Sequence, residues 1–374
     1  MKNSKSTVVK KSTSQFNKVW DNFVLKESKF EHIKPFTSKN NIPIVLATDN
    51  NYSKYMSVAI ESIIKNSTTD NNYDFIILDG GIKETVWTKI KGQFKGLNNF
   101  SLRRIDMSKY INLIEKDLFF ESRHIKTSAY YRLFIPNILK YYKKCLYLDI
   151  DIIVKKDISE LYNIELKNNV IGACEAKELV FLRKTNVKLD KYLREKLKLS
   201  TKDKYFNSGV LSINIEKMKD YSFSFFSLLK ELKNPRYHDQ DILNSVFNGK
   251  VKFLDSRWNV EWHIVNMNYI SKLTYLCLET RKHNKKIIEE GSFFVIHYIG
   301  GVKPWHKHNV LGVKYFWEYA KTSPFYFSLL YNPYKTKILR IGANFLTRVV
   351  RILTCLIPIK NLRKKARKIL LDSI

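Results

Sequence analysis

Two aspartates, Asp149 and Asp151, stand inside an otherwise apolar segment that runs from Leu146 to Val154. Residues two apart in an extended strand point to the same face, so the two carboxylates are expected to project together. Neighbouring carboxylates in an apolar setting repel each other and are costly to desolvate, and a divalent cation would relieve both problems. Such oxygen ligands suit Mn²⁺ or Mg²⁺, which can hold a diphosphate. The alternative is a strand end in solvent, where the aspartates need no partner.

A second candidate closes the apolar run Phe293–His297, where His297 is followed by Gly300, Gly301 and Lys303. The imidazole could be a metal ligand, the glycines would let backbone amides approach an anion, and the lysine could neutralise a phosphate. The alternative is a buried, hydrogen-bonded histidine followed by an ordinary turn.

A third candidate segment, Tyr237 to Asp241, precedes the apolar helical run Ile242–Phe247. Asp239 or Asp241 could cap the N-terminus of that helix. Alternatively, a carboxylate and the amide of Gln240 at a helix entrance could bind sugar hydroxyls or stabilise a developing positive charge.

Two weaker candidates complete the set. Asn207 and Ser208 precede Gly209 at the start of an apolar run, and a turn is all that these residues need form. Arg132 is a charged residue in a largely apolar stretch, so it could pair with an internal carboxylate or with a diphosphate.

The elements that must position these residues alternate between apolar runs and amphipathic stretches. This alternation predicts an α/β protein with a mostly parallel sheet covered by helices on both faces. Ligands of such sheets bind beyond the carboxyl ends of the strands, which favours residues 49–51, 149–151 and 297–303. The expected strands are Ile42–Thr48, Tyr73–Leu78, Phe100–Ile105, Cys145–Val154, Val170–Cys174, Gly209–Ile215, Val251–Leu254 and Phe293–His297, and the expected helices are Tyr55–Asn66, Thr85–Phe94 and Thr127–Leu139.

The charge balance indicates an anionic partner. The chain of 374 residues carries 66 Lys and Arg against 35 Asp and Glu, a formal net charge of +31. Such an excess is typical of proteins that bind nucleic acid, anionic lipid or phosphorylated substrates. About half of it lies on the flanks 1–41 and 335–374. The densest basic cluster lies in the C-terminal tail and no nucleic-acid motif occurs, so a nucleic-acid partner is not expected. The usual dinucleotide and P-loop motifs are also absent, so other groups would have to bind the phosphates of a nucleotide.

The four cysteines show no metal-binding or disulfide spacing, which favours a reducing environment. The N-terminus lacks the apolar core of a secretory signal, and no run of about 18 apolar residues predicts a membrane-spanning helix. A cytoplasmic protein is expected.

Taken in order, the motifs resemble those of the family 8 retaining glycosyltransferases, above all the bacterial branch that adds galactose or glucose to lipopolysaccharide, and more distantly glycogenin. The resemblance covers about 42–310. Its pieces are the segment from Ile44 to Tyr52, then TSAYYRLFIP, YLDIDIIV, YFNSGVLSINI, HDQDILN and the segment from Lys303 to His306.

The resemblance implies a Rossmann-like GT-A fold, a UDP-hexose donor and a Mn²⁺ ion, with Mg²⁺ as the other option. Asp149, Asp151 and His297 would be metal ligands that also contact the donor. His124 and Tyr237 fall where the bacterial members contact the acceptor. The remaining implied donor-binding residues are Ala47, Thr48, Asp49, Asn51, Arg132, Ile150, Asn207, Ser208, Asp239, Gln240, Gly300 and Lys303.

The catalytic role would fall to Gln240 or Asp239, which would stabilise the reacting face of the sugar. A glutamine amide is a poor nucleophile, so front-face attack is preferred to a covalent intermediate as the route to retention. Asn50, Ile150 and Ile299 depart from the usual pattern of the family, which leaves the transferred hexose open.

The C-terminal segment is a candidate for membrane attachment. Residues 337–357 place their polar side chains on one narrow side of a helix and apolar side chains on the rest, and a basic cluster follows Pro358. This pattern is typical of an interfacial helix on an anionic bilayer, although a helix packed on its own domain is the alternative. The expected division is a basic extension over 1–41, a catalytic domain over 42–310 and a helical membrane-association segment over 311–374.

The expected function is transfer of galactose or glucose from a UDP-sugar to a lipopolysaccharide-type or other lipid-linked saccharide, at the inner face of the cell membrane. The alternative acceptors are protein or a cell-wall polymer. A basic nucleic-acid-binding protein is the remote alternative.

Overall fold

The structure is a computed structural model that describes residues 17–28, 32–114, 118–119, 127–266, 275–307 and 311–330. Its strands form a seven-stranded sheet in the order β3-β2-β1-β4-β7-β6-β8 and a three-stranded sheet in the order β5-β10-β9. The strands are β1 Asn41–Thr48, β2 Asn72–Asp79, β3 Phe100–Asp106, β4 Lys144–Leu148, β5 Ile152–Val154, β6 Ile171–Glu175, β7 Phe206–Asn214, β8 Val251–Phe253, β9 Val260–Glu261 and β10 Val295–His297.

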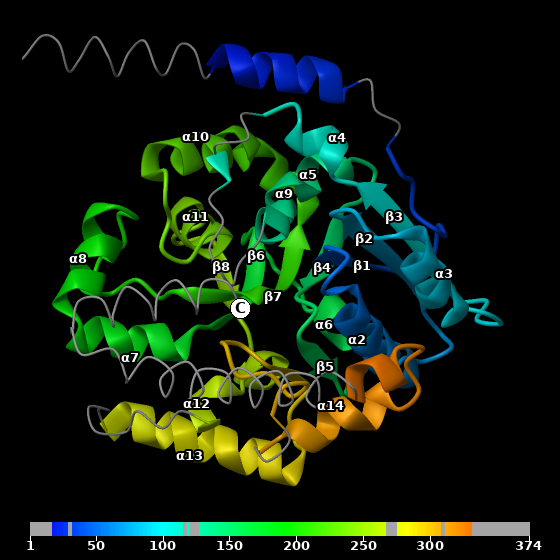
Figure 1. Cartoon of the computed structure of the whole chain (residues 1–374). Coiled ribbons are helices and arrows are strands. Elements are labelled where there is room, and N and C mark those ends of the chain that lie inside the picture. The colour runs from blue at the N-terminus through cyan, green and yellow to red at the C-terminus, as the bar shows by residue number, and fades with distance from the viewer. Residues whose placement is uncertain are drawn as a thin grey trace, which may run out of the picture.

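Helices surround both sheets (Figure 1). They are α2 Ser53–Lys65, α3 Glu84–Gly92, α4 Ser108–Ile111, η2 Thr127–Phe134, α5 Ile135–Ile138, α6 Ser159–Asn163, α7 Lys177–Thr185, α8 Val187–Glu195, α9 Ile215–Met218, η3 Lys219–Tyr221, α10 Ser222–Leu232, α11 Asp239–Val246, η4 Ser256–Asn259, α12 His263–Asn266, α13 Tyr275–Glu290 and α14 Val313–Ala320. A further helix covers 17–27.

The larger sheet is mostly parallel and buried on both faces. Only the pairs that β7 makes with β4 and β6 are antiparallel. Along β1, Ile44 and Leu46 belong to one core together with the side chains of α2. Val45 and Ala47 belong to the other core, together with η2 and α10. Alternate residues of a strand point to opposite faces, so this near-continuous apolar run is what a doubly covered sheet requires.

The expected strand Cys145–Val154 is wrong as a single element. β4 ends at Leu148 and pairs with β1 and β7, whereas β5 begins at Ile152 and pairs with β10 of the other sheet. Asp149 and Asp151 lie on the bend where the chain leaves one sheet for the other, and not on one face of a strand. Both flanking strands are buried, so the apolar pattern continues through the break.

The expected helix Thr127–Leu139 is also divided. Its first part is the 3₁₀ helix η2, and α5 begins at Ile135. Pro136 lies in the first turn of α5, where its missing N–H costs nothing because that group would have no partner inside the helix. The proline therefore starts a new short helix and does not extend the previous one.

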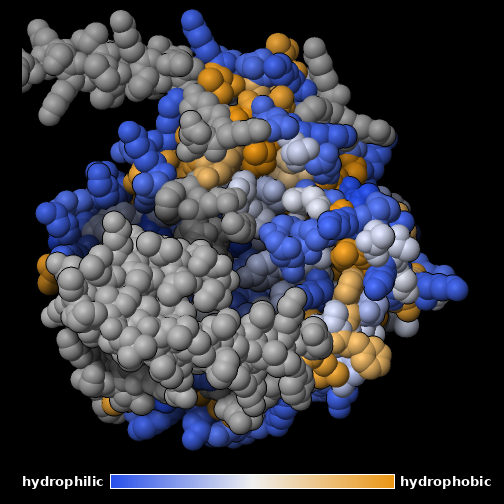
Figure 2. Space-filling view, in the orientation of Figure 1, coloured by the Kyte–Doolittle hydropathy of each residue, from blue (hydrophilic) through white to orange (hydrophobic). Residues whose placement is uncertain are grey.

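The helix over 17–27 packs beside α10 (Figure 1). Phe23 is fully buried, and Trp20 contacts the rings of Phe223 and Phe226. Figure 2 shows apolar surface around this end of the molecule. In the described part of the chain, no helix combines the length and apolar character needed to cross a membrane. The expected membrane segment over 337–374 and His124 lie outside the described residues.

Candidate active site

The candidate residues gather at one edge of the larger sheet. Asp49 follows the carboxyl end of β1, and Asp149 follows that of β4. β7 runs antiparallel to β4, so its first residues, from Phe206 onward, lie at the same edge. His297 ends β10, whose partner β5 begins just after Asp151. The position agrees with the rule that ligands of α/β sheets bind beyond the strand ends.

Asp149, Asp151 and His297 form the one cluster of potential metal ligands found among the described residues, and their ligand atoms lie within 4.8 Å of one another. His297 Nε2 is 3.1 Å from Asp151 Oδ1 and 3.6 Å from Asp149 Oδ2. Two carboxylates and an imidazole suit Mn²⁺, and they also suit other divalent ions. The residues present therefore fit a divalent cation.

The backbone of the bend is held from both sheets. The N–H of Asp149 donates to the carbonyl of Gly209 over 2.7 Å, which continues the pairing of β4 with β7. The N–H of Tyr298 donates to the carbonyl of Asp151 over 2.8 Å, which fastens the bend to β10. Each aspartate is thus positioned by a different sheet, and the carboxylates meet because the sheets meet.

The orientation of His297 is set by Asn259, a residue that the sequence analysis missed. Asn259 Nδ2 donates to Asn207 Oδ1 over 2.9 Å, so its Oδ1 is left to accept from His297 Nδ1, also at 2.9 Å. This contact fixes the ring so that Nε2 faces the two carboxylates; with a cation bound, Nδ1 would carry the proton and Nε2 would be the ligand atom. No local pattern marks Asn259, because its role depends on the position of η4 beside β10.

Gly209 leaves the space that the side chains of the potential metal ligands occupy. A Cβ on this residue would stand 2.1 Å from His297 Cε1 and 2.7 Å from Asp149 Oδ2. No side chain fits there. A glycine within a strand often marks such a close approach, and this signal was available in the sequence.

Arg132 connects the cluster to α11. Its guanidinium lies 2.8 Å from Asp149 Oδ1 and 3.0 Å from Asp239 Oδ2, and it stacks over the ring of Tyr147. Burial alone would lower the pKa of Arg132, but the charges of Asp149 and Asp239 outweigh it and hold that pKa above its usual value. Of the two expected roles, pairing with internal carboxylates is the one observed.

Ser208 positions both proposed catalytic side chains. Its hydroxyl donates to Asp239 Oδ2 and its N–H donates to Gln240 Oε1, each over 3.0 Å. Burial raises the pKa of Asp239 to about 6 despite the opposing charge of Arg132. Of the two roles considered for this segment, a side-chain cap by Asp239 or Asp241 is not observed, because α11 has no side-chain cap at its N-terminus.

Asp241 serves the packing of α11 instead of its cap. Its carboxylate accepts hydrogen bonds from the hydroxyls of Tyr192 and Tyr205 and from the N–H of Tyr237. The turn before α11 contains His238 at φ 54°, and the ring of His238 is hydrogen-bonded to the hydroxyl of Tyr130. These contacts fix the start of the helix that carries Asp239.

Lys303, in the loop after β10, contacts one of the potential metal ligands. Its Nζ donates to Asp151 Oδ2 over 2.5 Å and to the carbonyl of Tyr298 over 2.7 Å. Burial would raise the pKa of Asp151, but Lys303 and His297 outweigh it and hold that pKa well below its usual range. Gly300 has φ +89°, a conformation that favours glycine, so the tight turn explains the residue type.

The other expected donor residues lie around this cluster. Ala47 and Thr48 are buried at the end of β1, and Asp49 Oδ1 accepts from the N–H of Tyr52 over 2.9 Å. Asn51 is exposed, and Ile150 is partly buried between the two aspartates.

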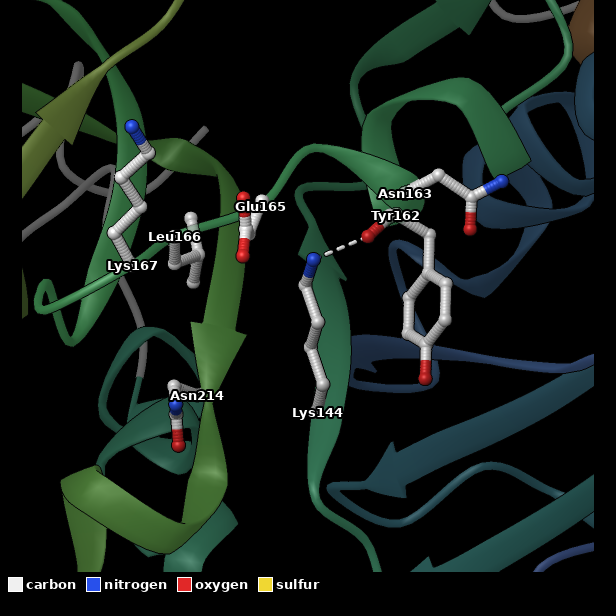
Figure 3. A pocket seen from close by; sticks show the side chains of 7 residues that line it. All are labelled: Lys144, Tyr162, Asn163, Glu165, Leu166, Lys167 and Asn214. Atoms are coloured by element: carbon white, nitrogen blue, oxygen red, sulfur yellow. Dashed lines mark hydrogen bonds between the residues drawn. The ribbon is translucent and has the colours of Figure 1, made fainter.

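A separate cavity of about 410 Å³ lies at the opposite end of β4 (Figure 3). Lys144, the first residue of β4, lines it and donates to the carbonyls of Tyr162 and Ile164. Its amine is therefore used to hold the segment after α6 against the sheet. None of the candidate site residues lines this cavity.

Comparison with known proteins assigns the chain to a family. The family model of glycosyl transferase family 8 matches residues 43–309. A putative glycosyltransferase of Haemophilus influenzae is 29% identical over 277 residues, which are 71% of this chain and 73% of that protein. The lipopolysaccharide 1,2-glucosyltransferase of Escherichia coli is 29% identical over 287 residues, which are 75% of this chain and 78% of that protein.

Among solved structures, the chain resembles the galactosyltransferase LgtC in complex with donor and acceptor sugar analogues. The TM-score is 0.60 at 28% identity, over 75% of this chain and 96% of that one. The fold is accordingly the GT-A glycosyltransferase fold that the sequence resemblance implies. With more than two thirds of its length matched by the family model, this chain belongs to glycosyl transferase family 8.

Proposed function

We propose that this glycosyltransferase is a metal-dependent, retaining enzyme that moves galactose or glucose from a UDP-sugar to a lipid-linked saccharide. The observation that carries the proposal is the convergence of Asp149, Asp151 and His297, with Lys303 beside them. A cation-binding cluster next to a lysine, at the carboxyl end of a parallel sheet, is suited to a nucleoside diphosphate.

The leaving group is the diphosphate, whose negative charge grows as its bond to the sugar breaks. A divalent cation held by Asp149, Asp151 and His297 would supply positive charge there, and Mn²⁺ is the ion that we propose. Lys303 adds a second positive charge when it turns from Asp151 toward a phosphoryl oxygen. The three ligand side chains are already assembled in the structure, so placing the charge of the cation needs little reorganisation.

The sugar lies against α11 in this proposal. Gln240 and Asp239 are fixed by Ser208, and Arg132 binds the same oxygen of Asp239 as the Ser208 hydroxyl does. The carbonyl oxygen of Gln240 stabilises the positive charge that develops at the anomeric carbon. The acceptor hydroxyl attacks the same face that the diphosphate leaves and gives its proton to the departing phosphoryl oxygen, which retains the anomeric configuration without a covalent intermediate.

The proposed acceptor is a lipid-linked saccharide, reached from the inner face of the cell membrane. A relative that acts on lipopolysaccharide supports this choice. The amphipathic and basic pattern over 337–374 supports attachment to an anionic membrane surface. We place the enzyme in the cytoplasm, peripherally bound to that membrane.

Nuclear magnetic resonance of the reaction tests the chemistry. The protein is incubated with Mn²⁺, a saccharide acceptor and either UDP-glucose or UDP-galactose, and the anomeric configuration of the product is read from its coupling constant. An α-linked product from an α-linked donor is expected. A β-linked product would contradict the proposal, and a glycosyl adduct on the protein in mass spectrometry would contradict front-face attack.

Vesicle sedimentation tests the attachment. The full chain should sediment with vesicles that contain anionic lipid and remain soluble with neutral vesicles. A chain that lacks 335–374 should stay in solution with both and should still hydrolyse the donor slowly. Sedimentation of the truncated chain with anionic vesicles would contradict the assignment of this segment.

A further inference from the structure

A group of basic side chains lies beside the cluster of potential metal ligands. Lys54 is the second residue of α2, and Lys303 and His306 belong to the loop after β10. The two segments are joined by Tyr55 and Trp305, whose rings stack at a centroid distance of 3.9 Å. The lysine amines lie against this stacked pair, Lys54 Nζ at 5.1 Å from the ring of Tyr55 and Lys303 Nζ at 5.8 Å from the ring of Trp305.

Both aromatic rings are buried, at 6% exposure for Tyr55 and 1% for Trp305. The stacked pair is therefore a fixed part of the core and not a chance contact between surface side chains. It holds the start of α2 against the loop that carries Lys303, so the positions of the cations relative to one another are set by packing.

The charge of Lys54 has no acidic partner among the described residues. Lys303 is bonded to Asp151, but no described carboxylate lies within ion-pair distance of Lys54. Partial burial lowers the pKa of Lys54. The N–H of His306 donates to the carbonyl of Lys303 over 3.0 Å, and desolvation together with the charges of Lys303 and Lys54 lowers the pKa of His306. A desolvated cation beside like charges is unfavourable, and an anion would relieve it.

The N-terminus of α2 adds to the positive potential. This helix of 13 residues has no acidic side chain in its first turn, and the one carboxylate bonded at its start is that of Asp49, which accepts from the N–H of Tyr52. The free N–H groups of a helix start carry partial positive charge that favours anions. Lys54 and the helix start therefore act in the same direction.

The proposed function leaves a deficit of positive charge that these groups would fill. The cluster of Asp149, Asp151 and Asp239 is offset by Arg132 and Lys303, which leaves one excess negative charge before a divalent cation binds. When a divalent cation binds, these five side chains and the cation together carry a surplus of only one positive charge. A sugar-linked diphosphate carries about two negative charges and gains about one more on release, because its terminal phosphate then ionises near pH 6.

We propose that Lys54 and His306 form an anion subsite with Lys303 that binds phosphoryl oxygens of the nucleoside diphosphate as it leaves the sugar. The inference rests on the proposed function and extends its binding site by two residues. The ligand is a phosphoryl group. The charge deficit favours the donor as its source, and a phosphate carried by the acceptor is the other source, which the test distinguishes.

Titration calorimetry in the presence of Mn²⁺ tests the subsite with UDP, UMP and uridine. Lys54→Met should weaken UDP binding about tenfold, equivalent to about 1.4 kcal/mol, with a smaller effect on UMP and none on uridine. The matched control is Lys314→Met. Lys314 lies 4.9 Å from the ring of Tyr315 on α14, so the variant removes a similar lysine that stacks on an aromatic ring elsewhere.

The possible failures are distinct. Unchanged affinity for both UDP and a phosphorylated acceptor in Lys54→Met would overturn the inference while leaving the proposed function intact. Equal weakening of uridine binding would also overturn it, because Lys54 would then support the nucleoside pocket. If UDP affinity is unchanged but a phosphorylated acceptor binds more weakly, the donor assignment is wrong. If the wild type itself does not bind UDP, the proposed function fails, and pyrophosphate titration of both proteins then decides whether the subsite exists.

A stability measurement guards against misfolding. Lys54→Met removes a partly buried charge that lacks a described carboxylate partner, so the melting temperature should not fall. His306→Gln should weaken the binding of UDP more than the binding of UMP. An equal effect on the binding of uridine would overturn the assignment of His306 to the subsite.

Discussion

Replacing Gly209 by alanine should abolish the metal site while leaving most of the fold in place. The new Cβ would lie 2.1 Å from His297 Cε1, and an ordinary contact needs at least 3.4 Å, so the ring must retreat by about 1.3 Å. The same Cβ would press on Asp149 Oδ2 from 2.7 Å. Metal–ligand distances tolerate only about 0.2 Å, so His297 and Asp149 could not bind one ion together.

The affinity for Mn²⁺ should therefore fall about 100-fold or more, because even outer residues around a metal site contribute about 10-fold to 100-fold. Electron paramagnetic resonance of free Mn²⁺ measures this affinity, and circular dichroism shows whether the variant is folded. Gly301→Ala is the control in the neighbouring loop, since its Cβ meets no atom within 4 Å. A folded Gly209→Ala protein with wild-type Mn²⁺ affinity would refute the proposed site.

Two further predictions concern stability. Arg132→Met should lower the free energy of unfolding, measured in urea, by about 3–5 kcal/mol, because the substitution leaves buried Asp239 without its cation. As a control, the substitution Arg257→Met at an exposed position should change the free energy of unfolding little. Equal effects of the two substitutions would contradict the assigned role of Arg132. Burial, and after it the charge of Lys252, lowers the pKa of Lys144 to about 8 in the folded protein. An ordinary lysine in the unfolded chain has a pKa of about 10.4, so between these two pH values the unfolded chain binds more protons than the folded protein. Wild type should gain stability relative to Lys144→Met over that range, and parallel melting curves against pH would contradict this.

The sequence predicted the fold best where a single strand or helix has its own uninterrupted apolar periodicity. The first three strands and the helices α2 and α3 match their expected ranges to within two residues. These elements follow one another along the chain and pack as neighbours, so the apolar periodicity of each reflects a single environment. The side chains expected at the strand ends consequently lie close together.

The sequence was misleading where the chain changes partners. The apolar run from Cys145 to Val154 looks like one buried strand, yet the bend at Asp149 and Asp151 joins two sheets. Local periodicity cannot reveal this, since both strands are buried in the same alternating manner. Asn259 was missed for a related reason, because only the long-range approach of η4 to β10 brings it to His297.

The bend also explains why this arrangement suits a metal centre. Each aspartate is held by a backbone hydrogen bond to a different sheet, and His297 arrives on the strand that pairs with β5. The ligands are thus fixed by backbone structure and not by flexible loops, which is the condition for a preorganised site.

Release of UDP from UDP-glucose or UDP-galactose, followed with and without EDTA, tests the central claim most directly. The account predicts turnover of one donor with Mn²⁺, loss of turnover in EDTA and recovery when Mn²⁺ is restored. Asp151→Ala should reduce the rate about 100-fold or more, whereas the distant Asp190→Ala should not. Turnover that survives both EDTA and Asp151→Ala would contradict the metal centre, and a wild type that releases no UDP from either donor would contradict the proposed reaction.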